Sequence, residues 1–236
     1  MFAVFNPALI LADIYCTVFC KILALLNEWE EAIMKITWLG HACFKLETAD
    51  GSVVFDPFSD GSVAGLDPIR ESADLALASH GHGDHAALEN VSLSGNKSSL
   101  RITAVPCFHD DEGGAKRGKN IIHIVESEGL RVAHFGDLGH MLSAQQLVQV
   151  GALDAAMIPV GGFYTIDAKM AREIADKLPC RVVIPMHYRS EHFGFPVLAA
   201  LDEFCALSKN IVQYDSNTLL LTADTPAQTA ILRYGK

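Results

Sequence analysis

The 236-residue sequence has no CxxC pair and no dense framework of cysteines, although it contains six of them. Dense disulfide frameworks are typical of small secreted domains, and CxxC pairs are typical of zinc ribbons and redox motifs. We therefore expect reduced thiols in a cytoplasmic protein. The cysteines are Cys16, Cys20, Cys43, Cys107, Cys180 and Cys205.

Basic residues are scarce too, with 18 lysines and arginines against 28 acidic residues and a formal net charge of -10. A protein that binds the phosphate backbone of nucleic acids presents a basic surface, so the composition argues against a nucleic-acid partner. A small-molecule substrate with an anionic group remains compatible with one or two local cations. Hydrophobic residues make up 50% of the chain, which is enough for a packed core.

A long uncharged apolar run is also missing, even in the strongly apolar segment of residues 1–33. Asp13 and Lys21 interrupt this segment, and no positive charge precedes its apolar part as in a secretory signal. We expect residues 1–33 to be an N-terminal extension, either a helix packed on the protein or on a second copy, or a segment upstream of the domain. A membrane anchor in residues 1–33 and a homo-oligomer stay open. The domain itself is expected over residues 34–236.

From residue 34 onward, β-branched and aromatic runs alternate with turn signals, which is typical of strands. Ser143 opens a helical segment with a Ser-x-x-Gln capping box, and Gly151 ends it. The order of elements predicts two sheets flanked by helices. We expect strands at 35–39, 42–47, 52–55, 74–78, 101–105, 120–125, 130–134, 154–160, 181–186, 211–214 and 218–222, and helices at 143–150, 166–178 and 197–207.

The stretch SHGHGDH, residues 79–85, places His80, His82, Asp84 and His85 within six residues. Side chains two residues apart in extended backbone point the same way, and the two glycines allow a turn that brings the last two to the same side. Imidazole nitrogens and carboxylate oxygens are ligands of divalent transition metals. The stretch therefore predicts a metal site rather than a polar turn that happens to be rich in histidine.

Three further candidate ligands follow apolar strands downstream: His109, Asp137 and His187. Sites often form at sheet edges just beyond strand ends, so we expect these residues to join the stretch 79–85. Together the seven residues make two sets of three around one shared carboxylate. His80, His82 and His109 form one set, Asp84, His85 and His187 form the other, and Asp137 lies between them.

Several motifs are spread over most of the domain: WLGHACF (38–44), DPF (56–58), SHGHGDH (79–85), FHDDEGGAKRGKN (108–120), HFGDLGH (134–140), PVGGFYTIDA (159–168) and IPMHY (184–188). With them, residues 34–209 resemble the metallo-β-lactamase superfamily, in particular its ascorbate-phosphate lactonase-like proteins and small metal-dependent hydrolases. The resemblance implies an α+β fold, a four-layer αββα sandwich with a dinuclear metal site at one edge. It also agrees with the ligand sets given above.

Such a site predicts a metal-dependent hydrolase. Two neighbouring cations lower the pKa of a shared water from 15.7 to about 7, and the resulting hydroxide attacks a carbonyl or phosphoryl centre. The expected substrate is a small ester, lactone or phosphodiester, and Asp84 is expected to orient the hydroxide and relay its proton. Zn²⁺ is the first expectation for both ions, and the ligands also suit Mn²⁺ and Fe²⁺. The alternative is a di-iron redox protein or a non-catalytic metal-binding protein with the same ligands.

Other polar residues in the motifs are candidates for roles around the metals. His41 is expected to face the site as a catalytic hydrogen-bond donor, although a plain turn residue is the alternative. Arg117 and Tyr164 are candidates for substrate binding, against a solvated loop charge and a packing residue. A supporting role behind the ligands is expected for Asp56, His134 and His140.

Overall fold

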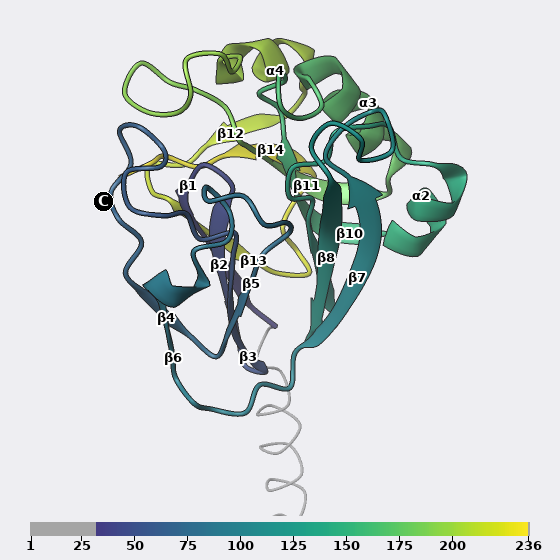
Figure 1. Ribbon diagram of the computed structural model, residues 1–236. Coiled ribbons are helices and arrows are strands. Elements are labelled where there is room, and N and C mark those ends of the chain that lie inside the picture. The colour runs from purple at the N-terminus through teal and green to yellow at the C-terminus, as the bar shows by residue number, and fades with distance from the viewer. Residues whose placement is uncertain (1–31, 236) are drawn as a thin grey trace, which may run out of the picture. The chain divides into compact units, whose positions relative to one another are not determined.

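Two β-sheets packed face to face dominate the computed structural model, which describes residues 32–235 (Figure 1). The first sheet contains β1 (Met34–Gly40), β2 (Cys43–Thr48), β3 (Gly51–Phe55), β5 (Leu75–Leu77) and β13 (Thr218–Leu221). The second contains β7 (Arg101–Phe108), β8 (Lys119–Ser127), β9 (Leu130–His134), β10 (Leu153–Pro159), β11 (Cys180–Met186), β12 (Ile211–Gln213) and β14 (Gln228–Ile231). The strand orders are β13-β1-β2-β3-β5 and β12-β14-β11-β10-β9-β8-β7.

Alternating burial along the strands places an apolar core between the sheets. In β1, Met34, Ile36 and Trp38 are buried and the residues between them are more exposed. Phe55 of the five-stranded sheet stacks on His134 of the seven-stranded sheet, with ring centroids 5.1 Å apart. Each fully buried large apolar side chain contributes about 1.5–3 kcal/mol to stability, so this core holds the two sheets together.

Three helices cover the outer face of the seven-stranded sheet (Figure 1): α2 (Ala144–Val150), α3 (Ala168–Lys177) and α4 (Leu201–Leu207). The first begins with the predicted capping box, because Ser143 and Gln146 each accept a hydrogen bond from the other's backbone N–H. The second packs on β10 and β11, and the third packs on the second. The predicted α+β sandwich is confirmed.

A different layer covers the outer face of the five-stranded sheet within residues 32–235. Phe58, Val63 and Ile69 pack there against Cys43 and Val54. Beside this loop lie the short helix η1 (Leu88–Asn90) and a two-stranded sheet of β4 (Glu71–Ala73) and β6 (Val91–Leu93). In an αββα sandwich, helices cover the outer face of each sheet. Here an apolar loop and a small sheet cover the outer face of the five-stranded sheet.

The expected helix over residues 197–207 is wrong at its start, because α4 begins only at Leu201. Ala199 instead donates its N–H to Gly161 and accepts a hydrogen bond from Arg189, at 2.8 and 3.1 Å. These hydrogen bonds to distant segments hold the backbone extended where local spacing favours a helix. The expected strand at 101–105 runs three residues further, and β4, β6 and β14 were not expected.

The expected extension over residues 1–33 lies, except for its last two residues, outside the described part of the chain. Residues from Ile33 onward form one compact unit. Within residues 32–235, no helix combines the length and the apolar character that crossing a membrane requires.

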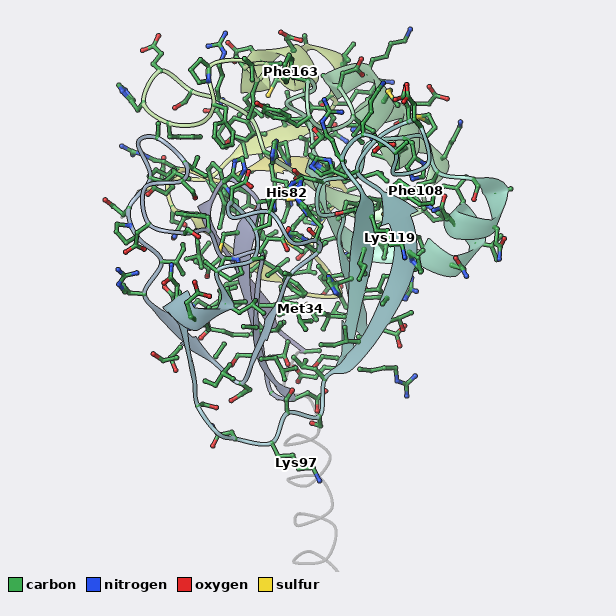
Figure 2. The ribbon with its side chains drawn as sticks, in the orientation of Figure 1. Met34, His82, Lys97, Phe108, Lys119 and Phe163 are labelled. Atoms are coloured by element: carbon green, nitrogen blue, oxygen red, sulfur yellow. The ribbon has the colours of Figure 1, made fainter. Side chains whose placement is uncertain are left out.

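The strand directions place the C-terminal ends of the strands that precede the candidate site residues at one edge of the sandwich. In the first sheet, β1, β3 and β5 run the same way, because β2 is antiparallel to β1 and β3, and β3 is parallel to β5. In the second sheet, β7, β9, β10 and β11 also share one direction. The segments after these strands build the site, and Figure 2 shows His82 in the upper half of the view, away from Lys97.

Candidate metal centre

Six strands end directly before, or lead into, the candidate side chains at this edge. From the five-stranded sheet come His41 after β1, Asp56 after β3 and the stretch 79–85 after β5. From the seven-stranded sheet come His109 after β7, Asp137 after β9 and His187 after β11. All seven predicted ligands therefore lie at one edge, as the strand pattern predicts.

At three of these strand ends, the residue that follows the strand has a left-handed backbone conformation. His41, Asp56 and His187 have φ angles of 52°, 46° and 55°, which non-glycine residues rarely adopt. The surroundings hold this conformation: the carbonyl of His41 accepts hydrogen bonds from Trp38 Nε1 at 3.1 Å and from His187 N at 3.2 Å. Strained backbone of this kind is frequent at functional sites, where it aims a side chain.

Asp137 occupies the centre of the cluster. Its Oδ2 lies 3.2 Å from Nε2 of each of His85, His109 and His187, and 4.0 Å from Nε2 of His80. The carboxylate thus contacts histidines of both predicted sets. This is the position expected for the shared carboxylate.

The two predicted sets are also spatial groups. The ligand atoms of His80, His82 and His109 lie within 4.8 Å of one another, and His80 Nε2 is 3.0 Å from His82 Nδ1. Within the same limit, His41 joins Asp84, His85 and His187 in a second group. Asp84 Oδ2 lies 3.3 Å from His41 Nε2 and 3.5 Å from His85 Nε2.

Unpaired buried atoms test whether these residues fit metal ions. Among the described residues, His85 Nε2, His187 Nε2 and Asp137 Oδ1 are buried without a hydrogen-bond partner. Leaving such an atom unpaired costs about 1–3 kcal/mol, and coordination removes that cost. Zinc–ligand bonds of about 2.0–2.1 Å in a tetrahedron put neighbouring ligand atoms about 3.3 Å apart, close to the separations around Asp137 and Asp84. The residues fit two divalent cations.

Asp56 supports the ligand loop from behind, as expected. Its carboxylate accepts hydrogen bonds from Ser79 N and Ser79 Oγ, both at 2.6 Å, and from His85 Nδ1 at 2.8 Å. Since Ser79 Oγ gives its proton to Asp56, it accepts one from His80 Nδ1 at 2.9 Å. Both histidines therefore direct Nε2 toward the centre, and each would present it unprotonated to a bound metal ion. The nearby set of Asp56, His80 and His85 is explained by these hydrogen bonds.

Burial and neighbouring charges set the protonation of the cluster. Burial, followed by the nearby His187, lowers the pKa of His41 to about 3, and burial with the nearby His85 lowers the pKa of His80 to about 3. Burial opposes ionisation of Asp137, yet the neighbouring His187 and His85 hold its pKa well below the usual range. His41 and His80 are therefore neutral, and Asp137 is an anion that attracts cations.

His85, which contacts both Asp137 and Asp56, behaves differently. Burial alone would lower the pKa of His85, but the nearby charge of Asp137 and the hydrogen bond to Asp56 raise it well above its ordinary value. A proton on this side chain supplies positive charge to two buried carboxylates. A bound cation would supply that charge instead and release the proton.

Asn120 forms hydrogen bonds that connect the segments carrying the ligands. No pattern in the sequence indicates this role. Its Oδ1 accepts a hydrogen bond from Asp137 N at 3.0 Å, and its Nδ2 donates to Phe135 O at 2.9 Å. The next residue, Ile121, donates its N–H to Ser79 O at 3.0 Å. The side chain is buried, so these bonds fix Asp137 against the stretch 79–85.

Close packing explains the glycine that precedes Asp137. A Cβ on Gly136, which has φ +53°, would lie 2.3 Å from Ser79 Cβ and 2.5 Å from Asn120 Oδ1. Only glycine allows these three segments to approach this closely. The motif HFGDLGH therefore needs its first glycine for the shape of the centre.

A cavity of about 310 Å³ opens beside the cluster. Both residues predicted to bind substrate, Arg117 and Tyr164, line it together with Phe195, which sequence reasoning missed. Phe195 follows β11 by nine residues, and no pattern in the sequence indicates that its loop returns to the site. The other lining residues are His82, Asp84, His109, Asp137 and His187.

The two histidines that flank Asp137 in sequence lie outside both ligand groups. His134 Nε2 donates to Ala42 O at 2.8 Å, and its Nδ1 accepts from Gly136 N at 3.2 Å. His140 Nδ1 donates to Met141 O at 2.8 Å, and its Nε2 accepts from Phe108 N at 3.1 Å. Both connect loops near the centre, in line with the supporting role expected for them.

In sequence comparisons, this chain is similar to metal-dependent hydrolases. A family described as "Beta-lactamase superfamily domain" matches residues 35–187. A "UPF0173 metal-dependent hydrolase" of Methanoregula boonei is 33% identical over 190 residues, covering 66% of this chain and 83% of the relative. A protein with the same description from Archaeoglobus fulgidus is 32% identical over 196 residues, covering 66% and 84%.

Solved structures share the fold. A crystal structure from Thermotoga maritima, described as a candidate zinc-dependent hydrolase of the metallo-β-lactamase superfamily, has a TM-score of 0.67 and 34% identity. The match covers 85% of this chain and 100% of that one. A structure from Parabacteroides distasonis, 20% identical, has a TM-score of 0.60 and covers 86% and 94% of the two chains.

Proposed function

The chain belongs to the metallo-β-lactamase superfamily, among its metal-dependent hydrolases, and on this basis we propose that it cleaves a small ester, lactone or phosphodiester with two divalent metal ions. One observation carries the proposal: a buried carboxylate oxygen, Asp137 Oδ2, lies 3.2 Å from Nε2 of three histidines that come from both ligand groups. Such a shared anion suits a pair of cations better than one.

The residues divide between the two ions by their positions. His80, His82 and His109 would hold one ion, Asp84, His85 and His187 would hold the other, and Asp137 would contact both. When bound, such ions lower the pKa of water and stabilise negative charge on oxygen. Asp56 and Ser79 fix the ring orientations of His85 and His80, which keeps their Nε2 atoms directed at the centre.

In this proposal, Asp84 directs a water molecule toward the substrate. Its carboxylate lines the cavity, and its Oδ2 lies 3.3 Å from His41 Nε2. Burial alone would raise the pKa of Asp84, but the hydrogen bond from His41 and the nearby His85 lower it well below the usual range. Asp84 therefore stays ionised and accepts a hydrogen bond from water, while His41 positions Asp84 by donating to it.

Further features belong to the same proposal. Zn²⁺ is the first candidate for both ions, with Mn²⁺ and Fe²⁺ as alternatives, because histidine and carboxylate ligands accept all three. The partner is a small molecule, since the cavity of about 310 Å³ lies at the lower end for ligand sites. Free Cys43, Cys107, Cys180 and Cys205 suit a reducing, cytoplasmic location. A homo-oligomer is compatible with these features.

Metal analysis combined with a substrate screen tests the proposal. Protein purified without added metal should contain two zinc or manganese ions per chain, and should hydrolyse members of a panel of esters, lactones and phosphodiesters. Asp84→Asn should keep the fold and lower kcat by about 100-fold or more, because the neutral amide orients water poorly. Two irons with oxygen-dependent redox chemistry and no hydrolysis would refute the proposal, as would full activity in a two-metal Asp84→Asn variant.

A further inference from the structure

Arg117 is the single lysine or arginine among the residues that line the cavity beside the metal centre, all of which belong to the described part of the chain. Within residues 32–235, no carboxylate lies within 4.0 Å of its guanidinium. Its charge is therefore available to a ligand.

The acidic residues of its own loop are engaged elsewhere. The carboxylate of Asp110 accepts hydrogen bonds from four backbone N–H groups of the loop, those of Glu112, Gly114, Lys116 and Arg117. The ammonium of Lys116 lies 2.7 Å from Glu112 and 3.7 Å from Asp111. Two adjacent cations thus have different environments, because Lys116 pairs with loop acids and Arg117 borders the cavity.

The guanidinium of Arg117 contacts the loop of Phe163 and Tyr164. Its Nη2 donates to Phe163 O at 3.1 Å, and its Cζ lies 5.7 Å from the ring centroid of Tyr164. Phe163 has φ +54°, so this carbonyl is presented by a strained turn. Arginine has five N–H donors and Phe163 O uses one of them, so enough donors remain for a bidentate pair with a carboxylate.

An apolar surface connects the arginine to the metal centre. The Phe195 ring centroid lies 6.0 Å from that of Tyr164 and 5.5 Å from that of His41. At the metal end, the carboxylates of Asp84 and Asp137 line the cavity. Since Arg117 is the single lysine or arginine that lines the cavity, the surface beside the metal centre suits a substrate with one singly charged group apart from the reacting bond.

We propose that the substrate is a small ester or lactone with a separate carboxylate, and that Arg117 binds this carboxylate while the reacting bond lies at the metal centre. The inference rests on the proposed hydrolase function and adds the chemical class of its substrate. Tyr164 and Phe195 then contact the hydrocarbon part between the two polar ends. Arg117 acts here in specificity rather than on the reacting atoms.

Two esters of equal acyl length test this inference with the metal-loaded protein. 4-Nitrophenyl pentanoate is neutral, and the 4-nitrophenyl monoester of glutaric acid carries a terminal carboxylate. The wild type should prefer the monoester, and Arg117→Met should reduce the ratio of the two kcat/KM values by about 10–100-fold through the KM of the charged ester. Arg117→Lys should lie between them, and Lys116→Met, which removes the same charge from the same loop, should leave the ratio unchanged.

Equal loss of kcat for both esters in Arg117→Met would overturn the inference, because the arginine would then act on the reacting group. Calorimetric binding of the anilides, N-phenylglutaramic acid and N-phenylpentanamide, separates this result from failure of the hydrolase proposal. If no ester is hydrolysed but the acid binds more tightly and Arg117→Met removes that preference, the hydrolase proposal fails and the carboxylate site stands. Equal binding of both anilides, or no binding of either, overturns the inference.

Discussion

The five-stranded sheet supplies four of the seven candidate ligands from one loop, whereas the seven-stranded sheet supplies three from three separate strands. The first group lies in residues 79–85 after β5. The second consists of His109, Asp137 and His187, which follow β7, β9 and β11. We call these the clustered half and the dispersed half of the centre.

The two halves are held by different interactions. In the clustered half, Asp56 after β3 orients His85, and Ser79 orients His80. In the dispersed half, strand pairing and the buried side chain of Asn120 set the positions. The carboxylate that contacts histidines of both halves belongs to the dispersed half. The position of the shared ligand therefore depends on correct packing of both sheets.

The largest effect should come from replacing this shared ligand. Asp137→Asn removes the central negative charge and should abolish binding of both ions, with kcat/KM lower by on the order of 1000-fold or more. His82→Ala, in the clustered half, should remove one ion and leave the other, because the Asp84 group does not contain His82. Metal content per chain and hydrolysis of an accepted ester measure both effects.

Asp176→Asn is the matched control for the carboxylate change. Asp176 is exposed on α3 and pairs with Arg172 away from the centre, so metal content should stay at the wild-type value. Two ions retained in Asp137→Asn, or both lost in His82→Ala, would mean that the clustered half alone determines metal binding.

The two halves also differed in how far the sequence could predict them. The stretch 79–85 has four ligand-type residues side by side, so residue chemistry and two glycines were sufficient. His109, Asp137 and His187 became candidates because each follows an apolar strand, and strand ends that share a direction meet at one sheet edge. The strand pattern thus predicted which residues assemble, although not the distances between them.

Side chains that act through tertiary contacts escaped prediction. Asn120 is an ordinary polar residue at the start of a strand, and its role depends on the packing of Phe135 and Asp137 around it. Phe195 reaches the cavity only because its loop folds back over the site. The extended backbone before α4 likewise results from hydrogen bonds to Gly161 and Arg189, which local propensity does not contain.

A smaller effect should follow from removing the contact that fixes the dispersed half. Asn120→Ala leaves Asp137 N and Phe135 O without their partner. Metal affinity should weaken by about 10–100-fold without loss of any ligand, as for other residues that orient ligands. Titration with a competing chelator measures this affinity.

Asn90→Ala provides the comparison for Asn120→Ala. Asn90 also donates to a backbone carbonyl, that of Phe58 at 3.0 Å, but it lies outside the ligand groups. The stability of this variant should fall while metal affinity is retained. Equal metal affinity in both variants would show that Asn120 does not position Asp137.

The smallest effect concerns the pH dependence of stability in the β8–β9 hairpin of the dispersed half, measured by denaturant unfolding between pH 4 and pH 8. Burial and the opposite His134 lower the pKa of His123 from 6.5 to about 4. Between these values the unfolded chain binds a proton that the folded chain does not, so stability falls as the pH drops from 6.5 toward 4.

His123→Gln should reduce the slope of stability against pH by up to about 1.4 kcal/mol per pH unit. An unchanged slope in His123→Gln would mean that His123 does not titrate differently on folding, and that the acid sensitivity lies elsewhere in the centre.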